Sequence, residues 1–122
     1  MRSNTIALRA AAFLGFLAVA LGALGGHALK DYLAPETGAE TWRTATLYHV
    51  AHAIAMVALV LANRGRVPCW LFGAGIVLFS GSLYGLALDG PRWLGPVTPL
   101  GGIAFLVGWA WLVVSPRAKG WG

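Results

Sequence analysis

Three histidines have the widest chemical scope of any side chains in this sequence: His27, His49 and His52. His49 and His52 are three residues apart, so on a helix they share one face. A neutral imidazole can ligate a metal ion, exchange a proton or take part in a hydrogen bond. Both residues lie in an apolar run, where ionisable side chains usually face the interior of a helix bundle and mark functional sites. We therefore predict a polar site around these histidines.

Hydroxyl-bearing side chains accompany the histidines in neighbouring apolar runs. We expect them to join the histidines in one polar cluster, whose remaining members are Tyr48, Ser80, Ser82, Tyr84 and Thr98. One role for this cluster is structural, as hydrogen bonds between helices. A second is a pocket for a small ligand such as a lipid headgroup or a quinone.

A third role is a haem or metal site that uses His27 with His49 or His52. The pattern gives this role little support, because no carboxylate, no second cysteine and no His-x-x-x-His pair accompanies the histidines. A proton-coupled transporter is also weakly supported, since no carboxylate lies in an apolar run to carry the proton. All three roles stay open, and the candidate metal ligands are His27, His49 and His52.

The elements that must position these residues are set by the charges. The chain has 122 residues, of which 11% are charged, against about 25% in ordinary soluble domains. The charges leave four charge-free windows, Ala10–Leu29, Thr44–Asn63, Val67–Leu88 and Trp93–Pro116. Each is long enough for a helix that crosses a bilayer, which takes about 20 residues. We predict spans at about 10–29, 44–63, 67–88 and 94–115 in a single membrane domain over 1–122.

The short connections between spans predict an all-α, up-down four-helix bundle. The positive-inside rule then orients it. One side carries Arg2, Arg9, Arg64, Arg66, Arg117 and Lys119 and no acid, whereas the other carries Lys30, Arg43 and Arg92 with all the acids. We expect both termini in the cytoplasm (N-in/C-in), which places the polar cluster in the outer half of the bilayer.

Aromatic and polar residues mark the expected span ends. Trp42, Trp70 and Trp93 stand at the starts of spans two to four and Trp111 near the end of the last, as expected of indoles in the headgroup layer. Thr37 and Glu40 have the spacing of a capping box, so the second helix is expected to begin above the membrane. Ala18-Val19-Ala20 is similar to a signal-peptide cleavage site, but the apolar run continues to Leu29 and predicts a retained span.

Small residues predict where the helices touch. Lipid supplies no hydrophobic force between helices, so close packing on small residues matters more. The predicted packing positions are Ala18, Gly22 and Gly26 in span one, Gly81 and Gly85 in span three, and Gly101, Ala104 and Gly108 in span four. The same faces could serve a homo-oligomer or a membrane-complex partner.

The composition excludes several classes of protein. Four apolar windows leave too little surface for a soluble enzyme, and 58% hydrophobic residues exclude a disordered chain. The single Cys69 excludes a disulfide-stapled module. The net charge of +5 comes from loops and ends without a basic patch, so no nucleic-acid partner is expected.

Four motifs in order then resemble a known family. They are Gly25-Gly26-His27-Ala28-Leu29, the run from Trp42 to Ala53 with Tyr48-His49 and His52, Phe79-Ser80-Gly81-Ser82-Leu83-Tyr84, and Thr98-Pro99-Leu100-Gly101-Gly102 followed by Gly108-Trp109. The chain resembles, over about residues 10–112, the YgdD-like inner-membrane proteins (domain of unknown function 423), to which the eukaryotic transmembrane protein 256 is related.

The resemblance implies a four-helix protein of the bacterial inner membrane and no catalytic activity. Family members often carry glutamine or a similar residue where His49 stands, which makes metal ligation by His49 less general. We therefore expect a non-enzymatic binding or accessory protein of the lipid bilayer, with no catalytic residues and no cofactor. The alternative is a haem- or metal-binding redox protein.

Overall fold

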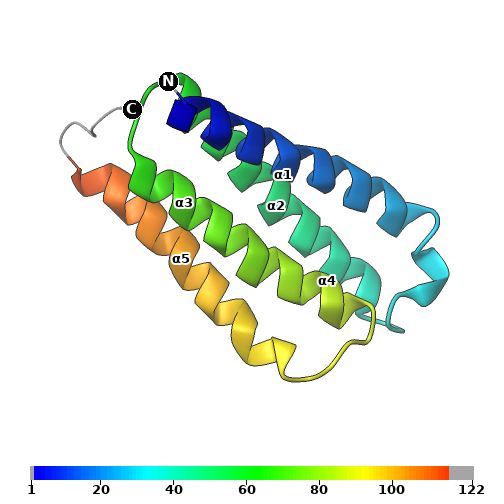
Figure 1. The fold of residues 1–122 in the computed structure, drawn as a ribbon. Helices are drawn as coiled ribbons and strands as arrows, with labels where there is room; N and C mark the ends of the chain where they lie inside the picture. Colours follow the sequence, from blue (N-terminus) through cyan, green and yellow to red (C-terminus); the bar gives the residue numbers. More distant parts are fainter. Residues whose placement is uncertain (1, 116–122) are drawn as a thin grey trace.

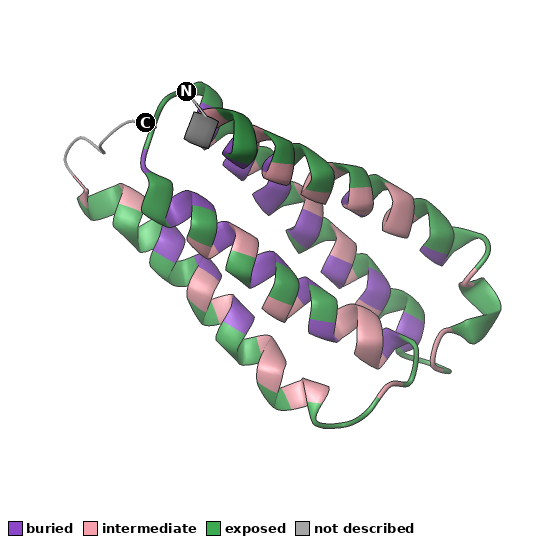
Figure 2. Ribbon diagram, viewed as in Figure 1, coloured by how far each residue is buried: buried purple, intermediate pink, exposed green. Residues whose placement is uncertain are grey.

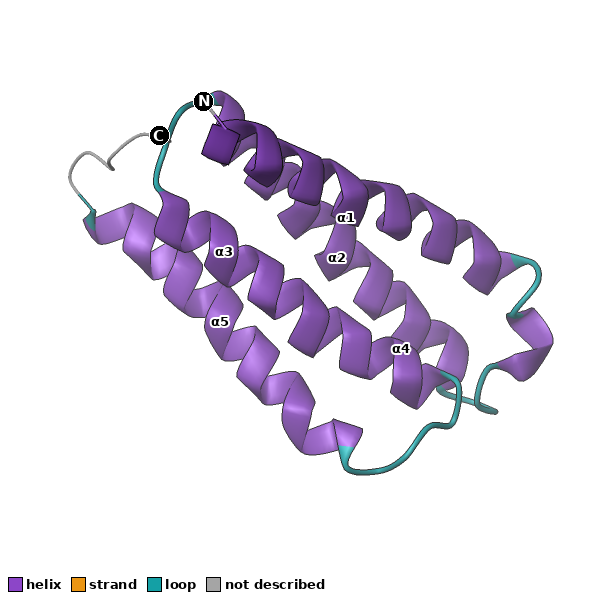
Figure 3. Cartoon of the chain, in the orientation of Figure 1, coloured by secondary structure: helices purple, strands orange, loops and turns teal. Residues whose placement is uncertain are grey.

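A computed structural model describes residues 2–115, with side chains from Asn4 onward, and every regular element in that part is helical (Figure 3). The elements are α1 (Arg2–Gly26), the short 3-10 helix η1 (Lys30–Tyr32), α2 (Gly38–Leu61), α3 (Arg66–Gly75), the π-helical η2 (Ile76–Ser80), α4 (Gly81–Ala87) and α5 (Leu94–Val114). α3, η2 and α4 form one continuous span, so four helices are long and apolar enough to cross a membrane. The predicted all-α, four-span class is confirmed.

The four spans run up and down, and sequence neighbours lie side by side. α1 packs mainly on α2, α2 packs on the α3–η2–α4 span, and α5 packs on the other side of that span. Figure 1 shows the start of α1, the 62–65 turn and the end of α5 together at one end of the bundle, here called the terminal end. η1 and the 88–93 loop lie at the opposite end, here called the η1 end.

The helices begin and end at identifiable signals. α2 begins at Gly38 with Thr37 as its N-cap, but the Thr37 side chain makes no capping hydrogen bond, so the predicted capping box does not form. At its other end α2 stops at a left-handed residue, Asn63 (φ 55°), around which the Arg64 N–H donates to the Leu59 carbonyl. This is the pattern of a Schellman C-cap, where asparagine tolerates the positive φ.

Apolar side chains cover the outside of the bundle. Val113 and Leu106 are 84% and 70% exposed, and Figure 2 shows exposed residues along the outer faces of all four spans. An exposed apolar surface of this extent marks contact with a membrane. The apolar core, which includes Met56, Cys69 and Phe72, lies toward the terminal end.

The packing positions differ in part from the prediction. Gly22 faces Thr46 of α2, and Gly101 and Gly108 meet Phe79 and Phe72. Gly85 meets Leu94, and Ala18 is buried. Gly26 and Gly81, however, face no neighbouring helix: nothing lies within 4 Å of a Cβ built at Gly26, and only a carbonyl one turn back lies near Gly81.

Helix geometry explains why Gly25 replaces Gly26 in the α1–α2 contact. A step of four residues overshoots a 3.6-residue turn, so a ladder of fours drifts around the helix. The face of α1 that contacts α2 runs through Ala11, Ala18, Gly22 and Gly25. Steps of three and of four residues alternate along it, so the face stays on one side of the helix. A Cβ at Gly25 would collide with the indole of Trp42.

Candidate functional site

The predicted polar cluster forms as hydrogen bonds between helices. The first group joins α2 to α4: His49 Nδ1 and the Tyr84 hydroxyl share a hydrogen bond of 2.9 Å. The Tyr84 hydroxyl also donates to Thr46 Oγ1 at 3.4 Å, and the Thr46 hydroxyl donates to the Trp42 carbonyl at 3.0 Å. His49 is 2% exposed; its Nε2 has no hydrogen-bond partner, although the Leu14 carbonyl of α1 lies near the ring.

The second group joins α2 to α5 through His52. Its Nδ1–H donates to the Tyr48 carbonyl at 2.8 Å, so Nε2 is the acceptor of the hydrogen bond from the Trp109 indole N–H at 3.0 Å. The ring also stacks on Phe105 with the centroids 3.7 Å apart. Both ring nitrogens are thus occupied, and His52 could ligate a metal only by giving up an interhelical hydrogen bond.

The two serines complete the hydrogen bonds around the middle span. Ser80, at the end of the π-helical turn, donates to the Ala45 carbonyl of α2 at 2.8 Å. Ser82 lies on the other side of the span and shares a hydrogen bond with Thr98 of α5. A π-turn inserts an extra residue into a helix and rotates the residues after it. Polar side chains of this span thereby reach both α2 and α5.

His27 and Tyr48 stand apart from this hydrogen-bonded set. His27 is exposed in the turn after α1. Tyr48 is 41% exposed and contributes its backbone carbonyl and its ring, which packs on Phe79 with centroids 4.8 Å apart. The His52–Trp109 pair lies past the middle of α2 and α5, toward the terminal end.

Three participants were not among the predicted site residues: Trp42, Thr46 and Trp109. A signal existed for Trp109, because an indole N–H inside an apolar span needs a partner. For Trp42 the interpretation as a headgroup-layer residue is wrong. It is 5% exposed, and its indole N–H donates to the Leu21 carbonyl of α1 at 2.8 Å. Trp70, Trp93 and Trp111 are each at least 44% exposed.

The described part of the chain contains no group of three or more His, Cys, Asp or Glu side chains placed to hold a metal ion. His27 and His52 have different surroundings: His27 is exposed, whereas His52 is buried and stacks on Phe105. His49 Nε2 is the one imidazole nitrogen of the buried pair without a committed hydrogen bond.

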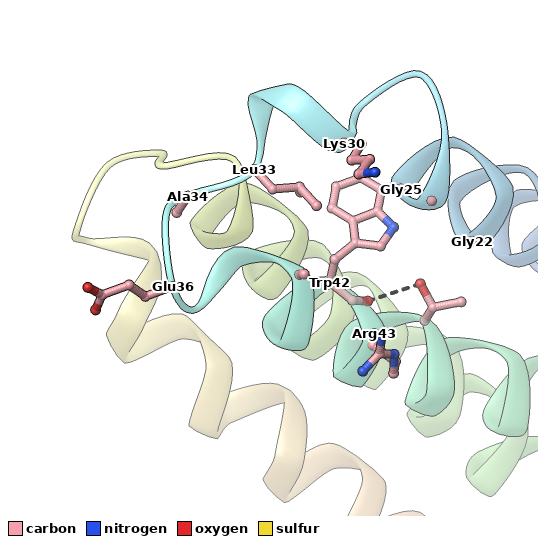
Figure 4. Close-up of a pocket in the computed structure, with 11 residues that line it drawn as sticks. Gly22, Gly25, Lys30, Leu33, Ala34, Glu36, Trp42 and Arg43 are labelled. Carbon is pink, nitrogen blue, oxygen red and sulfur yellow. Dashed lines mark hydrogen bonds between the residues drawn. The ribbon is translucent and has the colours of Figure 1, made fainter.

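A cavity of about 520 Å³ lies at the η1 end between α1 and α2, here called the α1–α2 cavity (Figure 4). Gly22, Gly25 and Gly26 of α1 line it on one side, and α2 supplies Trp42 and Thr46. Thr46 also belongs to the hydrogen-bonded group of His49 and Tyr84, so the cavity borders that group.

The charged residues of the α1–α2 cavity come from three segments: Lys30 of η1, Glu36 of the following turn and Arg43 of α2. In Figure 4 Lys30 lies beside the Trp42 ring, whereas the Glu36 carboxylate points away from both cations. Among the residues that the structure describes, neither Lys30 nor Arg43 forms an ion pair. The cavity therefore combines uncompensated positive charge with an apolar indole wall.

A second hollow, of about 560 Å³, lies between α1 and the α3–η2–α4 span. It is lined by apolar side chains that include Phe13, Leu14, Met56 and Val77. No charged residue lines it, so it resembles the surrounding lipid in character.

Comparison with known proteins agrees with this architecture. The family model "Protein of unknown function (DUF423)" matches residues 21–102, which hold both hydrogen-bonded groups except Trp109, as well as the α1–α2 cavity. The UPF0382 membrane protein YwdK of Bacillus subtilis is 44% identical over 81% of this chain and 85% of its own. The UPF0382 inner membrane protein YgdD of Escherichia coli is 43% identical over 86% of this chain and 84% of its own.

A UPF0382 membrane protein of Staphylococcus epidermidis is 39% identical over 81% of this chain and 84% of its own. No solved structure matches the chain. These relatives match 81–86% of the chain and are named as membrane or inner membrane proteins, in agreement with four helices able to cross a bilayer. The chain is a multi-pass membrane protein and belongs to the DUF423 family of UPF0382 inner-membrane proteins.

Proposed function

We propose that this protein is a non-enzymatic membrane component that binds the polar end of an amphiphile in the α1–α2 cavity. The observation that carries the proposal is the cavity itself, about 520 Å³ and lined by helix glycines, the Trp42 indole and cationic side chains. Ligand sites are usually concave, mostly apolar and of about 300–1,000 Å³, with a few polar groups that fix the ligand.

The position of the cavity favours an amphiphile over a water-soluble metabolite. It lies where α1 and α2 leave their apolar spans and enter the charged η1 end, so one part of a ligand would meet the bilayer and the other the charges. A molecule with an apolar tail and a polar head suits such a boundary. The outer faces of the bundle are left for other membrane proteins as further partners.

The polar cluster supports a structural role rather than catalysis. His52 uses both ring nitrogens in hydrogen bonds, and Ser80 donates to a backbone carbonyl across helices. A nucleophile or general base has to reach a substrate atom at about 3 Å, and these groups already contact the protein. The cluster joins α2 to α4 and α5.

Native mass spectrometry of the purified protein in detergent, with phospholipid titrated in, tests the proposal. Gly26→Leu adds a side chain at the cavity, because Gly26 lines it and nothing lies within 4 Å of a Cβ there. Gly15→Leu is the matched control, since Gly15 has equal room in the same helix and does not line the cavity. We expect Gly26→Leu to remove bound lipid and Gly15→Leu to leave it. Equal binding by the two variants would overturn the proposal.

The haem- or metal-dependent redox protein is the second candidate, and one observation favours it: His49 Nε2 is buried without a hydrogen-bond partner. It would need a second axial ligand, and His27 and His52 are respectively exposed and committed to other bonds. A visible spectrum with metal analysis of the purified protein decides between the candidates. A Soret band or a stoichiometric metal that His49→Ala abolishes would favour the redox candidate.

A further inference from the structure

We infer that the α1–α2 cavity recognises the phosphate of a lipid headgroup and that Lys30 and Arg43 are the residues that hold it. The inference rests on the proposed function, because it names the chemical class of the ligand for the same cavity. Its basis is a count of which polar groups around the cavity are still free to bind.

The neutral side-chain donors in the cavity wall are already used. The Trp42 indole N–H donates to the Leu21 carbonyl, and the Thr46 hydroxyl donates to the Trp42 carbonyl while it accepts from Tyr84. A neutral ligand that only accepts hydrogen bonds, such as a quinone, would find no free neutral side-chain donor among the described residues that line the cavity. Recognition of the ligand is therefore left to the charged groups.

The charged groups available to a ligand are cations. Lys30 and Arg43 come from different elements, η1 and α2, and line the same cavity. The Glu36 carboxylate points away from them in Figure 4, so it does not neutralise the pair. A guanidinium presents paired donors that match phosphate oxygens, and a lysine ammonium binds phosphate as a point charge. Each of these cations fits an anionic phosphate better than a neutral or cationic headgroup.

The surroundings of the cations favour a lipid phosphate over a free one. Trp42 packs its apolar ring on Gly25 of α1, and Leu33, Ala34 and Ala39 add further apolar lining. A free anion gains nothing from such apolar surface, whereas the glycerol and first methylenes of a lipid would bury against it, at about 0.8 kcal/mol per methylene in general. The ligand class is thus a phosphoglyceride bound by its phosphate.

The experiment compares two lipids with identical acyl chains, phosphatidylglycerol and diacylglycerol, by native mass spectrometry of the whole chain. We expect phosphatidylglycerol to bind more tightly, and Lys30→Gln or Arg43→Gln to weaken it by about tenfold each, as for the loss of a charged hydrogen bond. Arg92→Gln is the matched control, since Arg92 is exposed at the same end of the bundle and does not line the cavity. It should change lipid binding little.

The outcomes separate this inference from the proposed function. If phosphatidylglycerol and diacylglycerol bind equally and neither Gln variant matters, while Gly26→Leu still removes both, the phosphate assignment is wrong and the amphiphile site stands. If Gly26→Leu removes neither lipid, the site itself is wrong. Inorganic phosphate provides the third arm: displacement of the lipid by phosphate alone at an equal concentration would identify a free anion as the ligand and overturn the lipid assignment.

Discussion

The indole of Trp42 donates its N–H to the backbone carbonyl of Leu21 at 2.8 Å and so joins α2 to α1 across 21 residues of sequence. The same ring occupies the space that a side chain at Gly25 would need, and it contacts the Tyr84 ring with centroids 4.6 Å apart. One side chain therefore fixes α1, α2 and α4 at the η1 end. Because α1 packs mainly on α2, this hydrogen bond lies within the main interface of α1.

The contact between Trp42 and Gly25 predicts that substitutions at Gly25 and at Gly26 of α1 differ strongly in their effect on the free energy of unfolding. Gly25→Ala should destabilise the protein by about 1–3 kcal/mol, since the new methyl group would overlap the indole and force α1 away from α2. Gly26→Ala, one residue later, should cost little because its Cβ meets nothing within 4 Å. Thermal unfolding in detergent measures both variants. Equal stability of the two would contradict the Trp42 contact.

Trp109 and His52 predict an energetic coupling between α5 and α2. Trp109→Phe would leave His52 Nε2 without its donor, and we expect a loss of about 1 kcal/mol. A double-mutant cycle with His52→Phe should give a coupling free energy of about 0.5–1.7 kcal/mol, the range found for interhelical hydrogen bonds. Additive single-variant effects would show that the two side chains do not interact. Lipid binding in the α1–α2 cavity, toward the other end, should stay unchanged.

The hydrogen bond between His49 and Tyr84 predicts that polar and apolar replacements of His49 differ in their effect on stability. Gln can share a hydrogen bond with the Tyr84 hydroxyl, so His49→Gln should stay within about 0.5 kcal/mol of the parent chain. His49→Leu removes that bond and leaves the hydroxyl its 3.4 Å contact with Thr46, so about 1 kcal/mol of stability should be lost. Chemical denaturation in mixed micelles separates the two. A large loss in His49→Gln with a normal fold would mean that the imidazole itself is required.

The sequence predicts this fold well because charge placement alone limits where a helix can cross a membrane. The helices nevertheless extend past the charge-free windows: α2 includes Glu40 and Arg43, which a helix end can carry into the headgroup layer. The aromatic pattern was less informative. Trp42 and Trp93 both stand near span starts, yet one is 5% and the other 67% exposed, and only the packing of α1 distinguishes them.

The sequence predicts most of the side chains of the candidate site, but not which of them form hydrogen bonds with one another. Side-chain spacing placed His49 and His52 on one face, but their partners lie on different helices, Tyr84 on α4 and Trp109 on α5. Which helix each imidazole faces depends on interhelical rotation, including the π-helical turn at Ile76–Ser80, and no local pattern encodes that. The sequence does not reveal the α1–α2 cavity, because in the sequence Lys30 and Arg43 indicate only the orientation of the spans.

The orientation of the bundle decides which leaflet the α1–α2 cavity meets, and cysteine labelling tests it. The positive-inside rule places the terminal end, with Arg64 and Arg66, in the cytoplasm and the η1 end on the outer face. Asp31→Cys, an exposed site in η1, should therefore react with a membrane-impermeant maleimide in intact cells, once the outer membrane is opened where there is one. Arg64→Cys, in the opposite turn, should react only after the inner membrane is permeabilised. The native Cys69 is buried, so the parent chain should give a low labelling background.

Labelling of Arg64→Cys but not Asp31→Cys in intact cells would show that the topology is the inverse of the predicted one. The cavity would then meet lipids of the inner leaflet, and its phosphate ligand would come from the cytoplasmic side.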